Sequence, residues 1–172
     1  MIILIAGASH TGKTLFAQKL LEKYQYPYLS VDHLKMGLIR SKQTNLTPED
    51  DEKLIPYLWG IVKEIIKTVL ENKQNLIIEG DYIPFSWQKD FSKEERMQIR
   101  FCCLIMSKEY ICTHFSDIQK HASIIENRQH DEIDKEQLIK ENQENLVRCQ
   151  KYQYPHILIT DSYPSDISDY FR

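Results

Sequence analysis

A glycine-rich stretch near the start of the chain reads Gly7-Ala8-Ser9-His10-Thr11-Gly12-Lys13-Thr14. It follows the apolar run 2–6 and precedes residues 15–21, where apolar side chains recur at helical spacing. The pattern G-x-x-x-x-G-K-S/T between a buried strand and a helix start is typical of a phosphate-binding loop. Its glycines let the backbone wrap closely round a polyphosphate, so that N–H groups and the helix start point at the oxygens. The stretch therefore predicts a nucleoside triphosphate site.

Two side chains of this loop have expected roles in that site. Lys13 would reach the β and γ phosphates, and the hydroxyl of Thr14 would bind Mg²⁺. His10 could touch phosphate, but the variable positions of such a loop hold many residue types. ATP is the expected nucleotide, because the guanine-reading pattern N-K-x-D is absent from the sequence.

The bulk composition sets limits on the protein class. A chain of 172 residues fits a single domain, and 42% hydrophobic with 27% charged residues argues against disorder. A formal net charge of -3 supplies no basic field for nucleic acid or an anionic membrane. No apolar run approaches the roughly 20 residues of a membrane helix. We therefore expect a cytoplasmic protein; the pattern does not fix an oligomeric state.

The cysteines form neither a C-x-x-C pair nor a cluster at zinc spacing. They are Cys102, Cys103, Cys112 and Cys149. We interpret them as reduced thiols of the core.

Strand and helix patterns alternate along the whole chain. Strands are expected at 2–6, 27–31, 75–79, 100–106 and 156–160. Helices are expected at 13–24, 33–41, from 47 onward, in short turns within 86–97, at 108–122 and at 135–152. Five alternations predict an α/β fold: a P-loop NTPase three-layer α/β/α sandwich with a five-stranded parallel sheet.

Two of the expected helices have features that the structure can test. Thr47-Pro48-Glu49-Asp50 has the form of a helix start with Thr47 as the N-cap, and Pro56 would lie in or near the first turns. The helix at 135–152 has few apolar positions. So polar a helix is expected on the surface or over a cleft.

Carboxylates follow two of the expected strands. Asp32 comes after the second strand, and Glu79 and Asp81 end the third. The carboxyl ends of parallel strands lie at the sheet edge where ligands bind, so we expect the active edge where strands one, two and three end. Keeping a buried strand-end carboxylate ionised is costly unless it has a ligand role. For Asp32 the alternative is a helix N-cap.

Together these segments resemble the small P-loop kinases of the nucleoside-monophosphate kinase-like superfamily. The segments are GASHTGKT at 7–14, LSVDHLKMGLIR at 29–40, LIIEGDYIP at 76–84 and a late polar segment that carries an arginine. LIIEG with a following proline, and the early D-H-L-K, are most similar to the 2-phosphoglycerate kinase-like, zeta-toxin-like and antibiotic phosphotransferase branches. The resemblance covers most of the chain in layout, and the loop is its specific part.

The resemblance implies roles for the strand-end residues. It puts Asp32 at the acceptor site, as the base or as a ligand to the acceptor hydroxyl; phosphoryl transfer needs such a carboxylate beside the γ-phosphate. Glu79 takes the place of a Walker-B-like aspartate that holds Mg²⁺ through water, and Asp81 or Asp32 could support the metal instead. Lys35 and Arg40 would bind an anionic substrate or be solvated.

The resemblance also implies a lid, at about residues 123–134. Arg128 would neutralise charge on the transferring phosphoryl group, the alternative being a surface charge. Lids in this superfamily usually carry several arginines, whereas Arg128 is the only one between Ala122 and Val147.

These observations lead to one expected function and one alternative. The expected function is an ATP-dependent phosphotransferase, a kinase, that transfers the γ-phosphate to a hydroxyl of a small molecule. The acceptor would be a metabolite, nucleoside or antibiotic, chosen by loops after strands two and three. The alternative is a nucleotide-binding ATPase or switch module that transfers no phosphate to a small acceptor.

Overall fold

The computed structural model describes residues 1–121 and 133–164. The strands are β1 (Ile2–Gly7), β2 (Tyr28–Ser30), β3 (Leu76–Glu79), β4 (Ile99–Met106) and β5 (His156–Ile159). The helices are α1 (Lys13–Tyr24), α2 (Val31–Arg40), α3 (Asp51–Glu71), α4 (Lys93–Arg96), α5 (Lys108–His121) and α6 (Lys135–Tyr152), with a short 3-10 helix η1 (Trp87–Asp90). None of the helices within these ranges is long and apolar enough to span a membrane.

The five strands form one parallel sheet in the order β2-β3-β1-β4-β5. The central strand β1 is buried along its whole length, as its apolar run predicts for a strand covered on both faces. In register, Ile5 of β1 lies opposite Glu79 of β3, and Glu79 lies opposite Ser30 of β2. These three strands therefore end side by side at one edge of the sheet.

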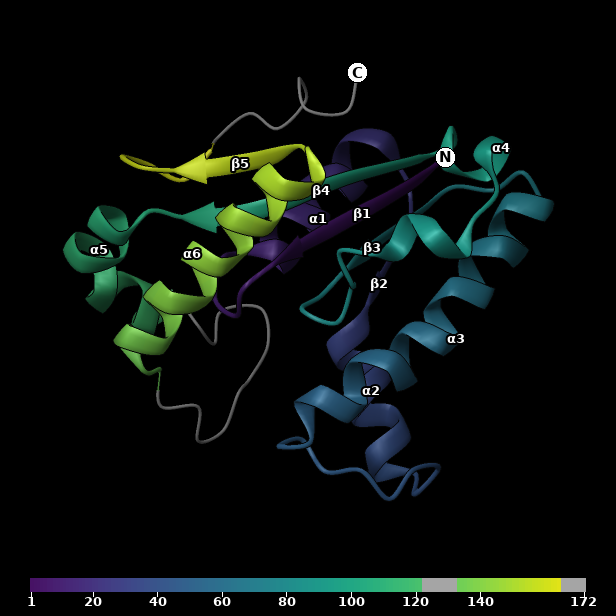
Figure 1. Cartoon of the computed structure of the whole chain (residues 1–172), viewed down its shortest axis with the longest axis horizontal. Coiled ribbons are helices and arrows are strands. Elements are labelled where there is room, and N and C mark those ends of the chain that lie inside the picture. The colour runs from purple at the N-terminus through teal and green to yellow at the C-terminus, as the bar shows by residue number, and fades with distance from the viewer. Residues whose placement is uncertain (122–132, 165–172) are drawn as a thin grey trace.

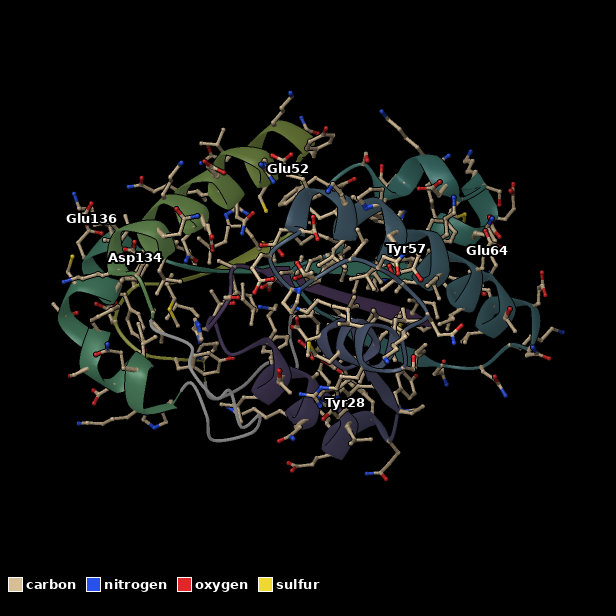
Figure 2. The ribbon with its side chains drawn as sticks, turned by 90° about the horizontal axis from the view of Figure 1, so that it is seen from below. Tyr28, Glu52, Tyr57, Glu64, Asp134 and Glu136 are labelled. Atoms are coloured by element: carbon tan, nitrogen blue, oxygen red, sulfur yellow. The ribbon has the colours of Figure 1, made fainter. Side chains whose placement is uncertain are left out.

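Helices cover both faces of the sheet, which gives the three-layer sandwich expected from the sequence (Figure 1). Successive side chains of a strand point to opposite faces. Ile2 and Leu4 pack with α2, α3 and the end of α6, whereas Ile3 and Ile5 pack with α1 and α5. Figure 2 shows the same layers from below, with α3 (Tyr57, Glu64) on the opposite side of the sheet from α1. The predicted fold class is confirmed.

The start of α3 differs from the prediction. The helix begins at Asp51, and Thr47 is not its N-cap. Instead the carboxylate of Asp50 accepts hydrogen bonds from the backbone N–H of Thr47 at 2.9 Å and from its hydroxyl at 3.0 Å. Residues 47–50 thus form a turn before the helix, because the same polar side chains can close a turn or cap a helix. Pro56 lies within the second turn of α3, as expected.

This turn makes a prediction about acid stability. Hydrogen bonds from the Thr47 backbone, from Lys53 and from the Thr47 hydroxyl lower the pKa of Asp50 from 3.8 to about 2. A folded pKa below the unfolded one stabilises the protein above the unfolded pKa, and that stabilisation is lost as pH falls through the folded pKa. We expect the difference in unfolding free energy between wild type and Asp50→Asn to shrink between pH 4 and pH 2. Urea unfolding at several pH values measures this; a constant difference would contradict it.

The cysteines are placed mostly as expected. Cys102, Cys103 and Cys149 are buried free thiols, and burial raises the pKa of Cys102 to about 12. Cys112 is exposed on α5, so its assignment to the core is wrong. The buried residues of this helix, Tyr110, Ile111 and Ile118, pack toward the sheet and leave Cys112 on the outer side.

Candidate active site

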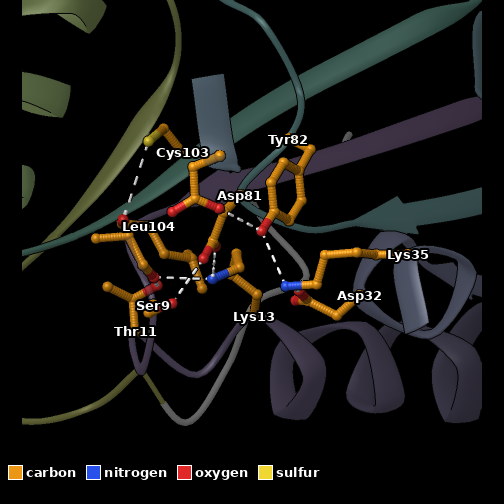
Figure 3. Close-up of polar contacts among 11 residues, drawn as sticks. Ser9, Thr11, Lys13, Asp32, Lys35, Asp81, Tyr82, Cys103 and Leu104 are labelled. Atoms are coloured by element: carbon orange, nitrogen blue, oxygen red, sulfur yellow. Dashed lines mark hydrogen bonds and ion pairs between the residues drawn. The ribbon is translucent and has the colours of Figure 1, made fainter. Parts of the chain in front are cut away.

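Three segments that are far apart in the sequence meet at the edge where β1, β2 and β3 end (Figure 3). Because Ile5, Glu79 and Ser30 are level in the sheet, the residues that follow them emerge side by side. They are the loop after Gly7, Asp81 after β3 and Asp32 after β2. The site residues predicted from the sequence at these strand ends therefore lie close together.

The glycine-rich loop has the tight conformation that a phosphate cradle needs. A Cβ atom on Gly7 would lie 2.6 Å from the Leu104 carbonyl oxygen, and one on Gly12 would lie 2.7 Å from the Tyr163 ring. Gly12 has φ of 80° and His10 has φ of 62°, a left-handed conformation that is uncommon in a residue with a side chain. The Thr11 hydroxyl closes the loop by donating to the Ala8 carbonyl at 2.8 Å.

Lys13 lies inside this loop at the first position of α1, and only 5% of it is exposed. Its ammonium donates to the Ala8 carbonyl at 2.8 Å and forms an ion pair with Asp81. Burial by itself disfavours the charged form, but the carboxylates of Asp81, Glu79 and Asp32 outweigh it and raise the pKa of Lys13. The site therefore contains a fixed, desolvated positive charge.

Oxygen ligands gather next to this charge. The Ser9 hydroxyl donates to Asp81 at 2.7 Å, and Glu79, the last residue of β3, is 1% exposed. Thr14 follows Lys13 on α1. Hydroxyl and carboxylate oxygens suit Mg²⁺, which usually binds one or two carboxylates together with substrate phosphates and waters.

The next question is whether protein side chains alone could hold a metal ion. Within residues 1–121 and 133–164 no group of three or more His, Cys, Asp or Glu side chains could hold a metal ion.

Asp32 lies in the first turn of α2, whose N-cap position is Ser30. The alternative role of Asp32 as an N-cap is therefore wrong. Its carboxylate pairs with the Lys35 ammonium at 3.2 Å, and Lys35 also donates to the Tyr82 hydroxyl at 2.9 Å (Figure 3). With only 14% of its side chain exposed, Lys35 belongs to this network and is not a solvated surface lysine.

Tyr82 and Asp51 complete the network, and sequence reasoning missed both. The Tyr82 hydroxyl donates to Asp51 at 2.9 Å; burial first, and then this hydrogen bond, raise the pKa of Tyr82. The hydroxyl therefore stays protonated and joins α3 to α2. Only the position of Tyr82 directly after Asp81 could have signalled its role.

Of the two predicted arginines, only Arg40 lies within the described residues. Arg40 is exposed at the last residue of α2, about 12 Å along the helix from Asp32 at 1.5 Å per residue. Arg128, and with it most of the expected lid, lies outside the described residues.

A cavity of about 350 Å³ opens beside the loop. Gly7 and Asp81 line one part of it, and Phe85, Arg148, Lys151 and Tyr152 line another. The last three residues lie on α6, so this polar helix covers a cleft as expected. Their individual contribution was missed, because an exposed cation on a polar helix has no distinguishing sequence pattern.

Comparisons with known proteins identify the fold. Neither a scan against protein-family models nor a search of curated proteins finds a match. Solved structures do match, and several are kinases.

A gluconokinase from Sinorhizobium meliloti 1021 is 15% identical with a TM-score of 0.51, over 94% of this chain and 83% of that one. A shikimate kinase from Bacteroides thetaiotaomicron is 12% identical with a TM-score of 0.53, over 97% and 90%. A tunicamycin resistance protein from Deinococcus radiodurans is 16% identical with a TM-score of 0.52, over 91% and 84%. The chain therefore has the α/β fold of the P-loop kinases; the branch within them stays a prediction.

Proposed function

We propose that this protein is an ATP-dependent phosphotransferase that transfers the γ-phosphate to a hydroxyl group of a small molecule. The observation that carries the proposal is the buried Lys13 ammonium, held in a glycine-rich loop and faced by Asp81, Glu79 and Asp32. A fixed cation, metal-type oxygen ligands and a separate carboxylate near the acceptor are the parts that phosphoryl transfer requires. The kinase names of two structural neighbours support this reading.

Each residue has a proposed task. Backbone N–H groups of residues 7–14 and the Lys13 ammonium bind the β and γ phosphates. Thr14 and Glu79, with Asp81, would hold Mg²⁺, and the ion would supply positive charge to the phosphates. Asp32 orients the acceptor hydroxyl and accepts its proton, and Lys35 holds the Asp32 carboxylate in place. Arg128 would close over the phosphates from a lid at about residues 123–134 of a single domain.

Nucleotide entry requires one change in the structure described. In this structure the Lys13 ammonium is paired with Asp81, and the phosphates of a nucleotide would have to replace Asp81 as its partner. We propose that Asp81 releases Lys13 as the nucleotide binds, an exchange after which the freed carboxylate would be available to hold Mg²⁺. Without the metal, the carboxylates at this edge repel the triphosphate.

This exchange predicts that ATP binding depends on Mg²⁺. We expect wild-type affinity for ATP to be at least about tenfold weaker in EDTA than with Mg²⁺, a difference of roughly 1.4 kcal/mol. Asp81→Asn should reduce the difference between the ATP affinities with Mg²⁺ and in EDTA, because it removes one repelling charge and one proposed metal ligand. Asp117→Asn, at an exposed position on α5, is the control. Isothermal titration calorimetry measures the six affinities, three proteins each with Mg²⁺ and in EDTA; equal wild-type values with and without Mg²⁺ would exclude the exchange.

One sequence feature favours the alternative function. The expected lid contains a single arginine, Arg128, which fits an ATPase or switch that transfers no phosphate to a small acceptor. Measuring ADP and phosphorylated acceptor together distinguishes the two functions. A kinase forms them in equal amounts, whereas an ATPase releases inorganic phosphate.

A further inference from the structure

The cavity beside Asp81 joins the proposed phosphate site to a group of cations. At one end it is lined by Gly7, where the glycine-rich loop begins, and by Asp81. At the other it is lined by Arg148 and Lys151. These are three residues apart on α6 and so project from neighbouring positions of one helix face. A molecule in this cavity would contact Asp81 and both cations.

The cations are available to a ligand. Arg148 pairs with Glu144 at 3.7 Å, but both side chains are half exposed, and ion pairs between exposed side chains are weak. The Arg148 guanidinium lies 5.7 Å from the centre of the Phe85 ring, which keeps it at the cavity wall. Among the described residues that line the cavity, Asp81 alone carries a negative charge, and it is paired with Lys13.

We infer that the acceptor reaches from Asp32 into this cavity, and that the part in the cavity carries a carboxylate or phosphate group separate from the reacting hydroxyl. The inference rests on the proposed kinase function and narrows the acceptor class, from metabolites, nucleosides and antibiotics in general to small anionic metabolites. The anion binds Arg148 and Lys151, and the carbon skeleton packs on Phe85 and Tyr152. A volume of about 350 Å³ is near the lower end of small-molecule sites and suits a compact acceptor.

The test compares matched anionic and neutral compounds on the protein with Mg-ADP bound. The pairs are gluconate with sorbitol, glycerate with glycerol, and glycerol phosphate with glycerol. Binding to the folded state raises the midpoint of thermal unfolding. We expect at least one carboxylate or phosphate compound to raise the wild-type midpoint and its neutral counterpart to leave it unchanged.

Variants of α6 assign the effect to the cavity. Arg148→Ala/Lys151→Ala should weaken binding of the stabilising anion by about tenfold or more, since a hydrogen bond to a charged group contributes about 1.5–3 kcal/mol. Lys140→Ala is the matched control, an exposed lysine of the same helix outside the cavity lining. All three side chains are exposed, so the variants should fold.

The outcomes separate this inference from the proposed function. A midpoint shift with Mg-ADP but with no anionic compound would overturn the inference and leave the nucleotide site standing. Equal stabilisation by an anion and its neutral counterpart, or anion binding that survives the double substitution, would overturn it as well. Absence of any shift with Mg-ADP would count against the kinase function itself.

Discussion

Lys13→Ala is expected to lower the rate of phosphoryl transfer by about 10²- to 10³-fold, the usual effect of removing one preorganised donor from a charge-stabilising site. The ammonium is buried, its pKa is raised and it already faces the place where phosphate oxygens would bind. Mg-ATP affinity should fall as well, because the cation contacts the phosphates in the ground state. Calorimetry and initial rates measure the two effects. Wild-type affinity in the variant would contradict the assigned role.

The same substitution should also lower the stability of the nucleotide-free protein. Removing Lys13 leaves Asp81 and Glu79 without the buried cation that compensates them. Breaking a fully buried pair costs about 3–5 kcal/mol. Because 28% of the Asp81 side chain is exposed, we expect a smaller loss. Lys13→Ala/Asp81→Asn should recover part of the stability but none of the ATP binding, which separates the structural effect from the functional one.

Asp32→Asn is expected to lower kcat by about 10²-fold or more, within the range of general acid–base catalysis. Asparagine keeps the shape of the side chain but cannot accept the proton of the acceptor hydroxyl. ATP affinity should barely change, because the Asp32 carboxylate, which pairs with Lys35, is proposed to act on the acceptor hydroxyl and not on the nucleotide. A capping role cannot explain such a loss, since Ser30 holds the N-cap position of α2.

The control for Asp32→Asn is Asp117→Asn. Asp117 and Lys120 form an ion pair with the same three-residue spacing as Asp32 and Lys35, on the exposed side of α5. Its loss should leave kcat unchanged. Full activity of Asp32→Asn would remove Asp32 from the chemical step and move the search for the base to Glu79 and Asp81.

Local patterns in the sequence predicted the elements that form the candidate site. The apolar run before Gly7 and the Gly-Lys-Thr at the helix start specify a strand, a loop and a helix with little dependence on the rest of the chain. The carboxylates after β2 and β3 could be placed at one edge because parallel strands end together. The order of the strands has no local signal, because pairing joins segments far apart in the chain.

Other parts of the site depend on contacts that no local pattern encodes. The hydrogen bond between Tyr82 and Asp51 joins residues 31 apart in the sequence. The cavity is lined by residues of α6 and of the loop after β3, which are also far apart in the chain. The glycine-rich motif predicts that Lys13 binds phosphate. It gives no sign that Lys13 forms an ion pair with Asp81 in the nucleotide-free protein. The polar residues at 47–50 have the pattern of a helix cap, but in the structure Asp50 bonds to Thr47 and closes a turn before the helix.

The central claim is that a phosphoryl group passes from ATP to an acceptor hydroxyl beside Asp32. The most direct measurement incubates the protein with Mg-ATP and each acceptor, and follows ADP and phosphorylated acceptor by mass spectrometry. The account predicts that wild type forms equal amounts of both, and that Asp32→Asn forms them about 10²-fold more slowly or less. ADP and inorganic phosphate without any phosphorylated acceptor, or an Asp32→Asn variant as fast as wild type, would contradict it.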